Sequence, residues 1–118
     1  MEPITAGAKT TLNNIFFESA KWDLLPESRA ELDEVVQLLK DNPKLRVEIS
    51  GHTDDIGSPE ANLALSRQRA QAVVSYLTKA GIAQTRLVTK GLGETAPVAP
   101  NSLESGRAQN RRIEFKVL

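Results

Sequence analysis

Apolar residues recur at two different periods along this chain, and the longer period marks two segments as helices. In the segment opened by Pro26, the apolar residues that keep helical spacing are Leu32, Val35, Val36 and Leu39. In the segment that begins at Pro59, the corresponding residues are Leu65, Ala72, Val73, Tyr76 and Leu77. We expect the first helix to end before Asn42-Pro43 and the second at Gly81, which suits a left-handed C-terminal cap.

A period of two marks the expected strands. Apolar and polar residues alternate in LRVEI at 45–49 and in IEFKV at 113–117, and the runs LNNIFF at 12–17 and RLVTKG at 86–91 are further candidates. The expected order is β-α-β-α-β, then a turn-rich loop with room for one helical turn, then β. Because each helix between strands is long enough for a right-handed crossover, we expect neighbouring strands to pair in parallel. Both helices would then share one face of a two-layer α/β or α+β fold.

Size, composition and charge narrow the classes of function. With 118 residues, 40% of them hydrophobic and 25% charged, the chain is suited to one domain with a single core. We assign residues 1–11 to a linker or lead-in and residues 12–118 to that domain. Lys and Arg (15) balance Asp and Glu (15), so no overall cationic field attracts nucleic acid or an anionic membrane. The lack of cysteine excludes disulfides and zinc-thiolate sites, and no run approaches the roughly 20 apolar residues that span a bilayer.

One polar stretch, SGHTDDIGSPEANLALSRQRA at 50–70, lies where a predicted strand meets a predicted helix. An ordinary helix start explains part of it, with Ser58 as the N-cap, Gly57 in the turn, and Asp54 and Asp55 near the positive end of the helix dipole. A binding site also explains it, because backbone amides and loop side chains converge at such junctions. The residues by themselves leave both interpretations open.

Two other kinds of site are weakly supported in this stretch. A hydrolase would combine His52, Asp54 and Ser66 as base, orienting acid and nucleophile, but the chain has no G-x-S-x-G motif. An EF-hand-like calcium loop that starts at Asp54 would need oxygen ligands where the sequence has Ile56 and Leu65. Adjacent aspartates do not supply that geometry, which argues against an EF-hand-like calcium loop.

A third alternative is RNA binding by the segment GRAQNRRIEF at 106–115. Arg107, Arg111 and Arg112 lie beside the aromatic Phe115, a combination that a sheet-surface RNA binder would use. The zero net charge and the aromatic content of 4% argue against it. Phe115 also shares its phase with Ile113, which predicts that its ring packs in the core.

Several motifs in a fixed order resemble the OmpA-like peptidoglycan-binding domain, the family of OmpA, Pal and MotB. They are NNIFFESAKWDL followed by PES and a helix, VEISGHTDDIGSPEANLALSRQRAQAVVSYL, the spacing GI-x3-R-x4-G-x-G from Gly81 to Gly93, and N-x4-GRAQNRRIEF. The resemblance extends from about residue 13 to residue 117. It implies an OmpA-like β-α-β-α-β-β fold, in which both main helices pack on one face of a mixed four-stranded sheet.

The same resemblance implies a non-catalytic domain, without cofactor or metal, that binds the diaminopimelate end of a peptidoglycan stem peptide. The two charged residues that hold this end in the family correspond to Asp54 and Arg69. A carboxylate and a guanidinium suit the ligand, because its end carries an ammonium and a carboxylate on one carbon. The further ligand-binding residues implied by the resemblance are Thr53, Asn62, Leu65, Ser19, Ala20 and Arg112.

A member of this family would tether an outer-membrane or envelope protein to the cell wall, in the periplasm of a Gram-negative bacterium. Its partner would be peptidoglycan and not nucleic acid, and any contact with a membrane would come from an N-terminal region outside this sequence. A homodimer is compatible with the sequence. The alternative function is a cell-wall hydrolase that uses His52 and Asp54.

The positions of Asp54 and Arg69 impose a geometric condition. If the second helix begins at Pro59, Arg69 lies about ten residues into it, roughly 15 Å along the axis. The turn at 51–57 must therefore fold back along the helix for Asp54 and Arg69 to reach one ligand. Arg67 points about 200° away from Arg69 around the helix and is expected to be solvated.

Overall fold

The computed structural model describes residues 15–17 and 26–118, and these form a mixed α/β fold, as predicted. The elements are β1 (Ile15–Phe16), α1 (Pro26–Asp41), β2 (Val47–Gly51), α2 (Pro59–Lys79), a 3₁₀ turn (Gln84–Arg86), β3 (Leu87–Gly91), α3 (Glu104–Asn110) and β4 (Arg112–Val117). The assignment of 1–11 to a lead-in lies outside the described residues. The loop before the last strand holds more helix than expected, since α3 has seven residues.

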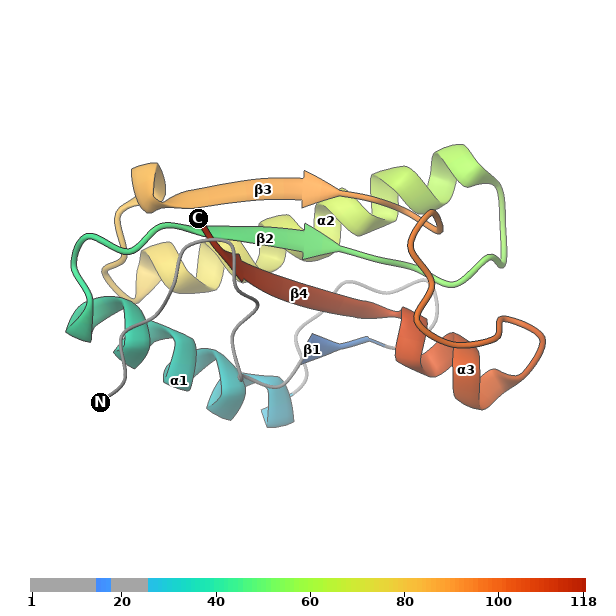
Figure 1. The fold of residues 1–118 in the computed structure, drawn as a ribbon, viewed down its shortest axis with the longest axis horizontal. Helices are drawn as coiled ribbons and strands as arrows, with labels where there is room; N and C mark the ends of the chain where they lie inside the picture. Colours follow the sequence, from blue (N-terminus) through green and yellow to red (C-terminus); the bar gives the residue numbers. More distant parts are fainter. Residues whose placement is uncertain (1–14, 18–25) are drawn as a thin grey trace.

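The strands form a mixed sheet in the order β1-β4-β2-β3 (Figure 1). β2 and β3 run parallel with Val47 opposite Leu87, whereas β4 is antiparallel to β2 with Phe115 opposite Ile49. β1 adds two residues to the outer side of β4, also antiparallel. The expectation that the first two strands pair in parallel is wrong, because β4 lies between them. Its three alternate apolar side chains are almost fully buried in the core, and a position in the middle of the sheet places them beneath the helices.

The core lies between the sheet and the two long helices. α1 contributes Leu32, Val35, Val36 and Leu39, and α2 contributes Ala70, Val73, Val74 and Leu77. These side chains pack on the inward residues of β2 and β4, which are Val47, Ile49, Ile113, Phe115 and Val117. In Figure 1, α2 runs along β2 and β3, and α1 lies on the side of β1. The opposite face of the sheet carries the polar side chains of both central strands.

The ends of α2 follow the sequence signals. Ser58 is the N-cap, and its side chain accepts a hydrogen bond from the N–H of Ala61 at 3.1 Å. At the other end Gly81 has a φ of 102°, and the N–H of Ile82 donates to the carbonyl of Leu77 at 3.0 Å. This pattern is a Schellman motif, which uses the left-handed conformation that glycine adopts without steric cost.

The last residue of β2 lies directly on α2. A Cβ atom on Gly51 would overlap the backbone carbonyl of Ser66 in the middle of that helix. The strand can therefore approach the helix backbone only because residue 51 has no side chain. This approach brings the chain that follows β2 alongside α2.

We expect Gly51→Ala to destabilise the protein by about 3 kcal/mol or more, at the upper end of the cost of overpacking, because the added methyl meets the backbone of Ser66, which cannot move aside as a flexible side chain can. Gly81→Ala is the control: its added Cβ would have no atom within 4 Å, and the left-handed conformation alone costs about 1 to 2 kcal/mol. Urea unfolding of both variants measures the difference. Equal losses would show that β2 and α2 do not need this close approach.

Candidate binding site

The turn between β2 and α2 folds back along the helix, as the positions of Asp54 and Arg69 require. Arg69 donates from Nη1 to the carbonyl of His52 at 3.0 Å, and Asn62 donates from Nδ2 to the carbonyl of Asp54 at 3.3 Å. On the other side, the N–H of Thr53 donates to the carbonyl of Gly93 at 2.9 Å. Side chains from two turns of α2 thus hold the backbone of this turn in place.

The carboxylate of Asp54 is buried in this turn, and each of its oxygens accepts a hydrogen bond there. Its Oδ1 accepts a hydrogen bond from the N–H of Ile56 at 3.1 Å, which closes a local turn. Its Oδ2 forms an ion pair with Nη1 of Arg111 at 3.1 Å. The side chain is 7% exposed, so solvent screens this ion pair only weakly.

Arg69 carries a second buried charge into the same place. It is fully buried, and its guanidinium carbon lies 5.0 Å from the centre of the Phe17 ring. Burial lowers the pKa of Arg69 to about 10, an effect that the charge of Asp54 opposes and the charge of Arg111 reinforces. The guanidinium therefore remains charged at neutral pH, and Asp54 is the carboxylate that offsets it.

Arg111 connects this site to three other segments. It donates from Nε to the carbonyl of Phe17 at 3.0 Å, from Nη1 to Asp54, and from Nη2 to Glu104 at 2.9 Å. Burial lowers its pKa, but the hydrogen bonds and charges of Glu104 and Asp54 outweigh burial and leave the pKa raised. One carboxylate and two guanidiniums thus meet at this end of the sheet, and Glu104 approaches from α3.

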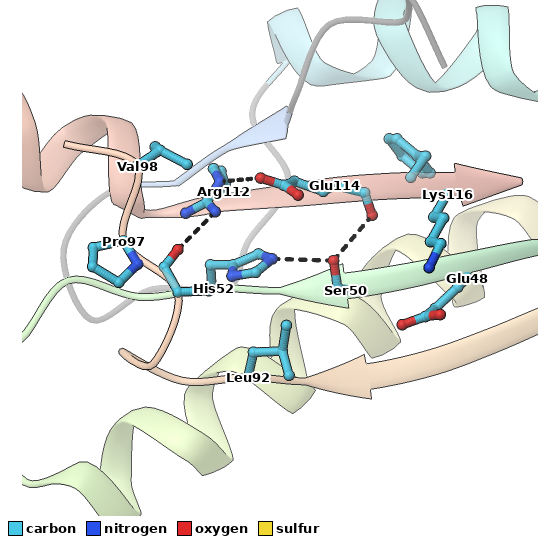
Figure 2. A pocket seen from close by; sticks show the side chains of 11 residues that line it. Glu48, Ser50, His52, Leu92, Pro97, Val98, Arg112, Glu114 and Lys116 are labelled. Carbon is cyan, nitrogen blue, oxygen red and sulfur yellow. Dashed lines mark hydrogen bonds and ion pairs between the residues drawn. The ribbon is translucent and has the colours of Figure 1, made fainter. Parts of the chain in front are cut away.

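The sequence reasoning placed Arg112 in the site, whereas the structure brings Arg111 to Asp54. Arg112 lies on the open face of the sheet, where it donates from Nε to Glu114 at 2.7 Å and from Nη2 to the carbonyl of Ala96 at 2.9 Å (Figure 2). It lines a cavity of about 370 Å³ there. The strand period contained the missing signal, because Arg111 shares its phase with Ile113 and so belongs to the helix side of the sheet.

The other residues implied by the family occupy different surroundings. Thr53 and Asn62 are buried beside Asp54, Leu65 is half-buried on α2, and Arg67 is exposed, as expected. Ser19 and Ala20 lie outside the described residues. The structure therefore groups Thr53, Asp54, Asn62 and Arg69 in one site, to which it adds Arg111.

The hydrolase triad is not assembled. Figure 2 shows His52 on the open face of the sheet, where Nε2 lies 3.0 Å from Ser50 Oγ, while the carboxylate of Asp54 pairs with Arg111. Ser66 is buried, and its hydroxyl donates to the carbonyl of Leu63 and accepts from the N–H of Gly93. Base, acid and nucleophile thus have separate partners.

The arginines of the proposed RNA surface are engaged within the protein. Arg107 pairs with Glu104 at 3.1 Å, and Arg111 and Arg112 have the carboxylate partners described above. The ring of Phe115 is buried in the core, as its phase predicted. Across residues 15–17 and 26–118, no cluster of three or more His, Cys, Asp or Glu side chains is arranged to hold a metal ion.

Comparison with known proteins gives the family. The OmpA family matches residues 16–111, so this chain belongs to it. It is 42% identical to the probable lipoprotein YiaD of Escherichia coli K12 over 103 residues, and the aligned segment covers 87% of this chain and 47% of that protein. It is 44% identical over 94 residues to the peptidoglycan-binding protein ArfA of Mycobacterium tuberculosis H37Rv, which covers 80% of this chain and 29% of that protein.

A solved structure supports the same fold. The peptidoglycan-associated lipoprotein from Burkholderia pseudomallei matches with a TM-score of 0.86 and 32% identity, over 89% of each chain. The chain thus matches most of that structure but spans less than two thirds of either curated relative. Within the described residues, no helix has the length and apolar character needed to cross a membrane.

We expect Asp54→Asn to destabilise the protein by about 3 to 5 kcal/mol, because it removes the carboxylate that offsets the buried charge of Arg69 and one of the two carboxylates that pair with Arg111. The neighbouring Asp55 is exposed, so Asp55→Asn should change stability by no more than about 0.5 kcal/mol. Urea unfolding at neutral pH compares the two variants. Equal effects would mean that Asp54 does not offset buried charge.

Proposed function

We propose that this domain binds peptidoglycan through the free end of diaminopimelate in the stem peptide. The observation that carries the proposal is the grouping of one buried carboxylate, Asp54, with two buried guanidiniums, Arg69 and Arg111. Burial of several charges in a surface turn is costly, and their mutual attraction commonly does not repay that cost in stability. A charged ligand gives this arrangement a use.

The ligand's charges match those of the site. Its ammonium needs a carboxylate acceptor, which Asp54 supplies, and its carboxylate needs N–H donors in a planar fork, which Arg69 supplies. Asn62 and Thr53 hold the backbone around Asp54, and this limits the ordering that binding would require. Neutral overall charge of the chain suits a zwitterionic end.

Membership of the OmpA family and the names of the relatives support wall attachment. We propose that the domain anchors an envelope protein to the cell wall in the periplasm of a Gram-negative bacterium, and that it performs no reaction. The hydrolase that would use His52 and Asp54 has no support from the site, since these side chains have different partners on different sides of the sheet.

Paired substitutions test this function. We expect Asp54→Asn and Arg69→Lys to weaken binding to purified diaminopimelate-type peptidoglycan by about 2 kcal/mol or more, roughly thirtyfold. The first removes the carboxylate of a desolvated charge pair, and the second replaces the planar fork of N–H donors by an ammonium that cannot bind a carboxylate in the same bidentate way. Asp55→Asn and Arg67→Lys are the matched controls, because both residues are exposed neighbours of the same charge type. Sedimentation with sacculi measures binding, and circular dichroism confirms that each variant is folded.

Two further measurements test whether the domain recognises diaminopimelate itself or another part of peptidoglycan. Free diaminopimelate should compete with sacculi for the wild-type domain, and lysine-type peptidoglycan should bind weakly, because lysine lacks the second carboxylate. Undiminished binding by folded Asp54→Asn and Arg69→Lys would refute the roles of these residues. Equal binding to both kinds of peptidoglycan would refute the choice of diaminopimelate.

A further inference from the structure

Glu104 is an exposed acid that reaches a buried arginine of the site. It is the first residue of α3, and its side chain is 65% exposed, whereas that of Arg111 is 9% exposed. Its Oε1 accepts from Nη2 of Arg111 at 2.9 Å, and its Oε2 accepts from Nε of Arg107 at 3.1 Å. Both hydrogen bonds lower the pKa of Glu104, that of Arg111 first, so the group is a carboxylate at neutral pH.

The three contacts of Arg111 differ in how easily they can be exchanged. Nε is bound to the backbone carbonyl of Phe17 and Nη1 to the buried carboxylate of Asp54. Both partners belong to the folded framework around the site. Only Nη2 is bound to a solvent-exposed side chain, and ion pairs with such exposed groups contribute little net stability. Nη2 is therefore the N–H group of Arg111 that an incoming carboxylate can take over most easily.

Arg111 can supplement Arg69 as a donor to the carboxylate of the ligand. Arg69 is fully buried, and its Nη1 is already bound to the carbonyl of His52. A carboxylate that enters from solvent must therefore penetrate below the surface to contact Arg69. Arg111 pairs with the same Asp54 and extends toward α3, so it can receive a second oxygen of the ligand.

We propose that Arg111 Nη2 binds the carboxylate of the ligand, and that Glu104 holds this place in the free protein. This inference rests on the proposed function, because it assumes a ligand with a carboxylate beside its ammonium. On binding, the ligand's carboxylate replaces that of Glu104, so Arg111 keeps an anionic partner throughout. Glu104 keeps Arg107, which also donates to the carbonyl of Asn101 at 2.8 Å and so stays beside α3.

The exchange makes Glu104 an internal competitor of the ligand. Its removal should strengthen binding of a carboxylate, because the ligand no longer has to break an existing ion pair. The gain should be absent for a ligand whose corresponding group is a carboxamide, since a neutral amide does not form the charge-assisted bond to Arg111. A purely structural role for Glu104, such as fixing α3, would affect both ligands alike.

The test uses Glu104→Gln and two synthetic stem tripeptides, one with a free diaminopimelate end and one with the carboxylate of that end amidated. We expect calorimetry to show that Glu104→Gln binds the free acid about two- to fivefold more tightly than the wild type, the range of an exposed ion pair. Its affinity for the amidated peptide should equal that of the wild type. Asp55→Asn removes the same charge from an exposed position beside Asp54 and should leave both affinities unchanged.

Each contrary result has a distinct meaning. Equal or weaker binding of the free acid by Glu104→Gln would overturn the role of Glu104. An equal gain for both peptides would indicate a purely structural role for Glu104, and the same gain in Asp55→Asn would reduce the effect to overall charge; either result would also overturn it. If the wild type bound neither peptide, the proposed function would fail together with this inference, whereas wild-type binding without the predicted gain would leave the proposed function intact.

Discussion

The burial of Asp54 between Arg69 and Arg111 is the constraint on which the site depends. A carboxylate removed from water needs both cations and hydrogen-bond donors, and here they come from α2, from the residue between α3 and β4, and from the turn itself. The same arginines bind the carbonyls of His52 and Phe17, so the ends of β1 and β2 are fixed by the charges that surround Asp54. Fold and site therefore share their polar contacts at this end of the sheet.

The close approach of β2 to α2 allows Asp54 to be buried near Arg69. Gly51 lies against the backbone of Ser66, and the turn that follows runs back toward Asn62. A bulkier residue at 51 would move the strand away from the helix and would separate Asp54 from Arg69. A feature of packing thus determines whether two residues fifteen positions apart in the sequence can act on one ligand.

Arg111 and Arg112 are neighbours in the sequence but lie on opposite faces of the sheet and make different contacts. Arg111 faces the helix side and pairs with Asp54, while Arg112 faces the open side and secures the segment around Ala96. Asn110, just before them, binds the N–H groups of Val98 and Ala99 and so holds the same segment from α3. Strand alternation accounts for this division, because successive side chains point to opposite faces.

The sequence by itself determined the two long helices, their caps at Ser58 and Gly81, and the strands, because periodicity and capping are local. The candidate site residues, among them Thr53, Asp54, Asn62 and Arg69, followed from the resemblance to the family and not from a local pattern. Tertiary structure alone decided that β4 lies between β1 and β2, since strand order depends on which apolar faces are buried together. It also decided that Arg111 rather than Arg112 meets Asp54. Strand alternation indicates which face of the sheet Arg111 occupies, but the contact with Asp54 spans 57 positions, and no local pattern specifies the partner of a buried charge at such a distance.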